Sequence, residues 1–131
     1  MPSSFLRSAA TGVLIAVVLV TVVWVVARVT GDDLRVQTPG NDNPEPMAIF
    51  FPAVAVIFNG LIGAGIVWLL RNRSNGRIIF LGLVAVILIF QGIQAFTATD
   101  SDGTALWLNG MHLAAAAAIV PIYLRLLARS V

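Results

Sequence analysis

Four apolar runs of about 20 residues each, near 9–29, 47–70, 78–97 and 105–127, dominate this chain. A helix of that length matches the hydrocarbon thickness of a bilayer. Of the 131 residues, 59% are hydrophobic and 11% are charged, whereas soluble domains carry about 25% charge. The sequence therefore predicts an all-α fold, an antiparallel four-helix transmembrane bundle that forms a single membrane domain over residues 1–131.

The charged residues between the apolar runs are sorted by sign. All six acids fall in the segments 30–46 and 98–104, whereas six of the eight arginines flank the opposite ends of the runs. The acids are Asp32, Asp33, Asp42, Glu45, Asp100 and Asp102. The six arginines are Arg7, Arg71, Arg73, Arg77, Arg125 and Arg129. Cytoplasmic segments are rich in basic residues, so we expect both termini in the cytoplasm and a multi-pass protein of the inner (plasma) membrane.

The ends of the runs carry further topological information. The first run exceeds the core of about 7 to 15 residues in a signal peptide, so we expect it to be a retained helix. Trp24 and Trp107 are expected near the outer interface, and Trp68 and Tyr123 near the inner one. The exported segment 30–46 is rich in proline, glycine and acids, which predicts an irregular exposed loop.

Small residues within the runs indicate close helix contacts. Gly60, Gly63 and Ala64 lie in the second run, and Ala114 and Ala118 lie in the fourth. Such residues let helix backbones approach each other in lipid, where packing replaces the hydrophobic drive for association. We expect these faces to pack against another helix, within this chain or in a partner.

Three arginines, Arg71, Arg73 and Arg77, crowd the short connection between the second and third runs. Their simplest role is to fix the orientation in the membrane. The alternative role is to bind an anionic lipid headgroup.

Polar side chains within the apolar runs are few, namely Asn59, Gln91, Gln94, Asn109 and His112. At 1.5 Å per residue from the outer helix ends, Gln91 and His112 lie about 10 Å deep, and Gln94 and Asn109 about 5 Å deep. Matched depths and i,i+3 spacing predict two hydrogen-bonded pairs, Gln91 with His112 and Gln94 with Asn109. They would either join the helices, face a partner, or line an outward-facing ligand pocket below Asp100 and Asp102, with Asn59 as its floor.

The residues that several functional classes require are missing from this sequence. There is no cysteine, which excludes disulfide exchange and thiolate metal sites. No acid lies within a run, which disfavours proton-coupled export. We find no metal-ligand set, cofactor motif, catalytic set or nucleic-acid-binding face, so we expect no cofactor, no metal, no nucleic-acid partner and no enzymatic activity.

Two segments carry a resemblance to known proteins. The residues concerned are Pro44, Glu45 and Pro46, then Asp102, Thr104 and Leu106, Met111, His112 and Leu113 before the alanine-rich stretch, and Ile119, Val120 and Pro121. In these positions the chain resembles a family of small bacterial four-span integral membrane proteins of uncharacterised function. The resemblance implies a stand-alone four-helix unit and carries no substrate or activity.

Two functional hypotheses follow. The first is a non-enzymatic accessory or scaffold subunit that packs against another membrane protein or against itself through its small-residue faces. The alternative is a small-molecule or lipid binder, or a transporter, with its pocket around His112.

Overall fold

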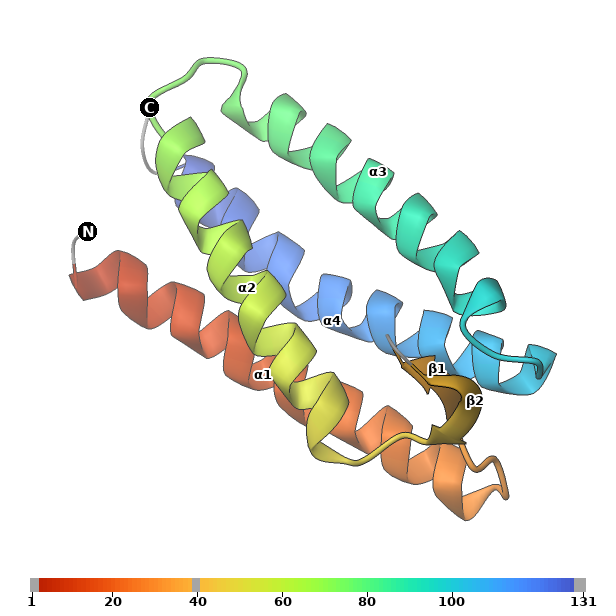
Figure 1. The fold of residues 1–131 in the computed structure, drawn as a ribbon. Helices are drawn as coiled ribbons and strands as arrows, with labels where there is room; N and C mark the ends of the chain where they lie inside the picture. Colours follow the sequence, from red (N-terminus) through yellow and green to blue (C-terminus); the bar gives the residue numbers. More distant parts are fainter. Residues whose placement is uncertain (1–2, 39–40, 129–131) are drawn as a thin grey trace.

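The computed structural model describes residues 3–38 and 41–128 (Figure 1). Over these residues there are four long helices: α1 (Ser3–Val29), α2 (Phe50–Leu70), α3 (Gly76–Thr97) and α4 (Asp102–Ala128). Each is long and apolar enough to cross a membrane. The helices therefore mark the chain as a multi-pass membrane protein, and the predicted number of apolar helices is confirmed for the described part of the chain.

Some helix ends differ from the ends of the apolar runs, because hydropathy reports the hydrocarbon-facing part and a helix continues past it. α1 begins at Ser3 and α4 at Asp102. At the start of α4 the Ser101 hydroxyl accepts a hydrogen bond from the Thr104 amide at 3.3 Å, which caps the helix. Asp102 lies in the first turn, where the helix dipole favours a negative charge.

The segment 30–46 is not the irregular loop that its composition predicted. Strand β1 (Arg35–Thr38) pairs antiparallel with strand β2 (Asn41–Pro46), and Val36 lies opposite Glu45. Pro39 and Gly40, which contribute to the loop-like composition of this segment, lie outside the described residues. The two prolines of β2 are compatible with a strand because β2 is an edge strand of a two-stranded sheet.

Buried apolar side chains explain why this segment is ordered. Leu34, Val36 and Met47 all belong to the core that includes Ala27 of α1 and Met111 of α4. Leu34 is 0% exposed and adopts a positive φ of 49°, which is rare for a residue other than glycine. The apolar contact and the hydrogen bond from the Met47 amide to the Leu34 carbonyl, at 3.0 Å, hold this conformation in place.

Consecutive helices run in opposite directions in Figure 1, with the described chain ends on one side and β1 and β2 on the other. α1 and α4 share the most extensive interface, α2 packs on α1, and α3 leans on α4. α2 and α3 contact each other least among these pairs, and Figure 1 shows them diverging. The divergence leaves space above α4.

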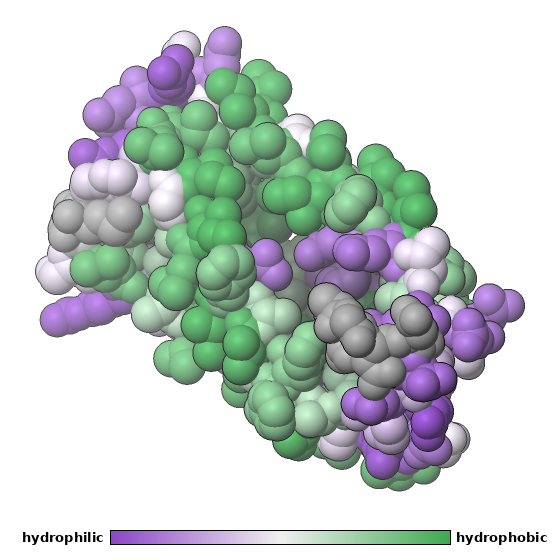
Figure 2. All heavy atoms as spheres, in the orientation of Figure 1, coloured by the Kyte–Doolittle hydropathy of each residue, from purple (hydrophilic) through white to green (hydrophobic). Residues whose placement is uncertain are grey.

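The surface is divided into an apolar middle and two polar ends (Figure 2). One polar end holds the turn between α2 and α3, and the other holds the strands. Many large apolar side chains of the helices are exposed, including Phe58, Leu69 and Phe90. An apolar surface of this extent is compatible with a lipid environment.

The small residues of α2 lie at helix contacts within the chain. A Cβ atom on Gly60 would lie 2.5 Å from Val13 Cγ2 of α1, and one on Gly63 would lie 2.9 Å from the Tyr123 ring of α4. Ala64 and Ala118 are buried, and Ala114 is half-buried. The close approach of backbone to side chain at Gly60 and Gly63 requires the absence of a Cβ.

Candidate functional site

A cavity of about 320 Å³ lies between α2, α3 and α4. Met47 and Phe51 line its end near the strands, and Phe80 and Tyr123 line the opposite end. Figure 2 shows it as a hollow on the face between α2 and α3. The cavity exists because α2 and α3 diverge while α4 lies beneath both.

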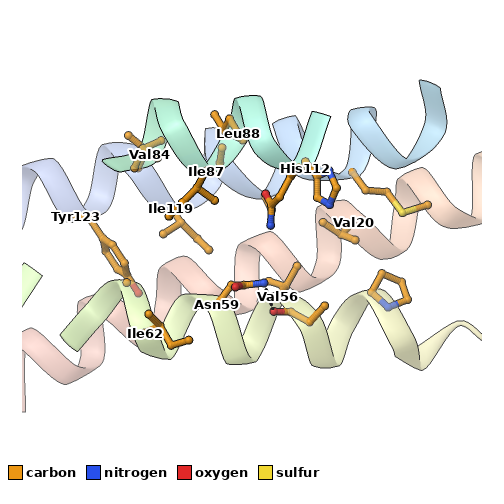
Figure 3. A pocket seen from close by; sticks show the side chains of 18 of the residues that line it. Val20, Val56, Asn59, Ile62, Val84, Ile87, Leu88, His112, Ile119 and Tyr123 are labelled. Atoms are coloured by element: carbon orange, nitrogen blue, oxygen red, sulfur yellow. Dashed lines mark hydrogen bonds between the residues drawn. The ribbon is translucent and has the colours of Figure 1, made fainter. Parts of the chain in front are cut away.

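Three of the polar residues predicted from the sequence line this cavity: Asn59 of α2, Gln91 of α3 and His112 of α4. Figure 3 shows Asn59 and His112 on opposite sides of the space. The other lining side chains are almost all apolar, for example those of Ile62 and Val84. The cavity therefore combines an apolar wall with a polar group from each of three helices.

The hydrogen bonds of these polar groups are incomplete among the described residues. The Asn59 Nδ2 donates to the Ala55 carbonyl of its own helix at 2.9 Å, which leaves the Asn59 Oδ1 without a protein donor. Gln91 has no side-chain hydrogen bond there. The Nδ1 of His112 is buried without a partner. Unpaired polar groups are costly in hydrocarbon, so these side chains need a further partner.

The two predicted hydrogen-bonded pairs are absent. Gln91 and His112 share the cavity without a hydrogen bond between them, and Gln94 is exposed. Asn109 instead donates to the backbone carbonyl of Gly92 at 3.4 Å and to that of Ala105 at 3.1 Å. Gly92 has no side chain, and a Cβ there would lie 3.2 Å from the Asn109 Oδ1, so the amide reaches the α3 backbone rather than the Gln94 side chain.

The remaining predicted pocket residues lie elsewhere. Asp100 and Asp102 are exposed beside the start of α4, and neither lines the cavity. The predicted opening of the pocket toward the outside, below these two acids, is also wrong. The hollow opens sideways between α2 and α3 (Figure 2), and two of its lining residues, Phe51 and Ile87, are half-exposed.

Tyr123 closes one end of the cavity, a role that the sequence did not indicate. It was expected near the inner interface, and its side chain is 0% exposed within the protein. Its hydroxyl donates to the Gly60 carbonyl at 2.6 Å, and Figure 3 shows it directed toward α2. Its ring lies 6.0 Å from that of Phe80, centroid to centroid. Gly60 and Gly63 were the features of the sequence that could have indicated this role of Tyr123, because glycines make room for a large side chain.

Among the described residues, no charged side chain lines this cavity. Across the described residues, no three His, Asp or Glu side chains gather in a group able to hold a metal ion. The arginines of the α2–α3 turn lie at the end of the molecule away from the strands. There the Arg71 guanidinium lies 3.0 Å from the centroid of the Trp68 ring, and Arg73 and Arg77 are exposed.

The fold and the cavity define a class, a multi-pass membrane protein with an apolar cavity between its helices. The chain belongs to a family of unknown function, DUF6069, which matches residues 2–129. No curated protein and no solved structure matches the chain. The match over nearly the whole chain agrees with the expected resemblance to a family of uncharacterised function.

Proposed function

We propose that this protein is a non-enzymatic integral membrane protein that binds a small, uncharged amphiphilic molecule in the cavity between α2, α3 and α4. One observation carries the proposal: Asn59, Gln91 and His112 face an otherwise apolar cavity with hydrogen-bonding capacity unused among the described residues. The volume of about 320 Å³ lies within the range of small-molecule sites, roughly 300 to 1,000 Å³.

The lining sets the chemistry of the ligand. Because the described lining of the cavity holds no charged side chain, a charged ligand would lose its hydration without gaining a counter-ion. A hydroxyl, carbonyl or amide group would bond to Gln91 and its polar neighbours. The apolar part of the ligand would lie against Ile62, Val84 and Tyr123, and it would enter sideways from the bilayer.

The placement in the membrane supports this function. The arginine-rich end is assigned to the cytoplasm and the strands to the outside of the plasma membrane, because six of the eight arginines flank one set of helix ends. Both termini are then cytoplasmic. The lateral opening of the cavity faces the lipid in this arrangement.

An accessory or scaffold subunit is the second candidate. One observation favours it: within the described chain, α3 buries only Gly76, Phe80 and Ala95, which leaves most of its apolar face uncovered. Against it, Gly60 and Gly63 already contact Val13 and Tyr123 of the same chain. The small-residue faces that suggested a partner are thus used internally, so the geometry favours the binder.

A cavity-filling pair of variants tests the proposal. Ala116 lines the cavity, whereas its neighbour Ala117 is exposed and does not. We expect Ala116→Phe to displace the ligand and Ala117→Phe to retain it. The measurement is native mass spectrometry of each protein released from cell membranes, with solvent extraction of any bound molecule.

The predicted result is one additional mass on the wild type and on Ala117→Phe that is missing from Ala116→Phe. An unloaded wild type, or equal loading of both variants, would contradict the binder. A stable second polypeptide in the wild-type spectrum, with no small molecule, would instead support the accessory subunit.

A further inference from the structure

A second pocket, of about 250 Å³, lies between α1 and α4 at the end of the molecule away from the strands. Its lining residues are Arg7, Ser8, Thr11, Ile122, Arg125 and Leu126. Arg7 and Thr11 are four residues apart on α1, and Ile122 and Leu126 are four apart on α4, so each pair lies on one helix face.

The close packing of α1 on α4 places Arg7 and Arg125 in the lining of one pocket. A Cβ on Gly12 of α1 would lie 3.1 Å from Ile122 Cδ1 of α4, so the absence of a side chain at Gly12 permits this approach. Arg7 and Arg125 are exposed, and they reach the same pocket from the two helices. Arg7 and Arg125 therefore share one pocket with the apolar residues Ile122 and Leu126.

These guanidinium groups have no acidic neighbour among the described residues. All acidic side chains of the sequence fall within 32–45 and 100–102, beside the opposite ends of these helices. The ion pair found in the described chain, between Arg28 and Asp33, is at that opposite end. Two like charges that share a pocket repel each other, and an anion between them would remove the repulsion.

We propose that this pocket binds a phosphate group, supplied by an anionic phospholipid or by free phosphate. Guanidinium groups bind phosphate oxygens through paired hydrogen bonds. Ser8 adds a hydroxyl, and Ile122 and Leu126 provide an apolar wall for the part of a lipid next to its headgroup. Basic pockets between transmembrane helices on the cytoplasmic side are suited to such headgroups.

The site is separate from the ligand cavity, because the two pockets share no lining residue. It also differs from the arginines at the α2–α3 turn, because Arg73 of the turn and Arg77 of the first turn of α3 are exposed at the same end of the molecule and are not among the lining residues of this pocket. These two arginines provide a matched control, since their replacement removes the same charge from the same end.

The experiment compares the wild type, Arg7→Gln with Arg125→Gln, and Arg73→Gln with Arg77→Gln. In the first arm, the delipidated protein is titrated with phosphatidylglycerol or phosphatidylcholine and bound lipid is counted by native mass spectrometry. In the second arm, inorganic phosphate replaces the lipid and binding is followed by phosphorus NMR. We expect the Arg7 and Arg125 pair to weaken binding about tenfold or more, and the control pair to change it less than about twofold.

Selective loss of phosphatidylglycerol binding identifies a lipid site, and selective loss of inorganic phosphate binding identifies a free phosphate site. Either result supports the proposal. Equal losses in the two double variants, or no loss in either, would overturn it, because the attraction would then be diffuse. Arg7→Lys with Arg125→Lys keeps the charge and serves as the test if the glutamine pair does not fold. We expect weaker phosphate binding from it, because lysine lacks the planar guanidinium group that donates paired hydrogen bonds.

Discussion

At the scale of single residues, two half-buried amides of the described chain differ in their hydrogen bonds. Asn109 bonds to the α3 backbone at Gly92, whereas Gln91 makes no side-chain hydrogen bond. The first amide therefore joins two helices, and the second faces a cavity. This difference separates a structural amide from a candidate binding residue.

We predict that Gln91→Leu and Asn109→Leu change stability in opposite directions. Gln91→Leu removes an unpaired amide from an apolar environment and should raise the free energy of unfolding by about 1 kcal/mol. Asn109→Leu removes an interhelical hydrogen bond and should lower it by about 0.6 to 1.7 kcal/mol. Equilibrium unfolding of the ligand-free protein in detergent measures both. A loss of stability in Gln91→Leu would then show that this amide is bonded within the protein.

The sequence predicts which polar residues lie inside the membrane but not the partners they choose. Depth follows from counting residues along a helix, so Gln91 and His112 were correctly placed in one region. The pairing depends on how each helix is rotated about its axis, which depth does not determine. For that reason the Gln94 and Asn109 pair was wrong, and the contact with Gly92 was missed.

At the scale of helices and strands, contacts at glycine set how closely the helices approach. Gly60 is buried against Val13, whereas a Cβ on Gly65 of the same helix would meet no heavy atom within 4 Å. Val13 is β-branched and has little rotamer freedom to move aside. The two glycines therefore allow a matched comparison.

We predict that Gly60→Ala destabilises the protein by about 1 to 3 kcal/mol, because the added methyl group overpacks the contact between α1 and α2. Gly65→Ala should be neutral or stabilising by up to about 1 kcal/mol, since alanine favours the helix. Thermal unfolding of both variants in the same detergent checks this. Similar midpoints for the two variants would mean that α1 and α2 are not in close contact at Gly60.

The strands show where composition misleads. The prolines, glycines and acids of 30–46 are typical of an exposed loop, yet Leu34 and Val36 within this segment are buried. Their burial depends not only on the nearby end of α1 but also on α4, which is distant in sequence. Asp32 strengthens this contact, because its Oδ1 accepts hydrogen bonds from the Thr104 hydroxyl at 2.7 Å and from the Leu34 amide at 2.8 Å.

At the scale of the whole molecule, the polar ends and the apolar middle give a testable orientation. The chain has no cysteine, so single cysteines report accessibility without background. Ser101 and Ser74 are both exposed, the first near the strands and the second in the α2–α3 turn. We predict that a membrane-impermeant maleimide labels Ser101→Cys in intact cells and labels Ser74→Cys only after permeabilisation. The reverse pattern would invert the topology.

Hydropathy was sufficient to predict the membrane class and the apolar helices, because each run is long enough to cross a bilayer by itself. The cavity could not be predicted in the same way. It arises from the divergence of α2 and α3 over α4, which depends on side-chain packing along three helices. The sequence therefore located polar residues of the candidate site without its shape or its lateral opening.

Photolabelling with two matched probes tests the central claim, binding of a neutral amphiphile between α2, α3 and α4. A long-chain alcohol and the carboxylic acid of equal length would each carry a diazirine on the chain, and the labelled residues would be mapped by mass spectrometry. We predict that the alcohol labels cavity residues such as Ile62, Val84 and Val120. Excess unlabelled alcohol should prevent this labelling, and the acid should not label these residues. Labelling spread evenly over the exposed apolar side chains, unaffected by competitor, would contradict it.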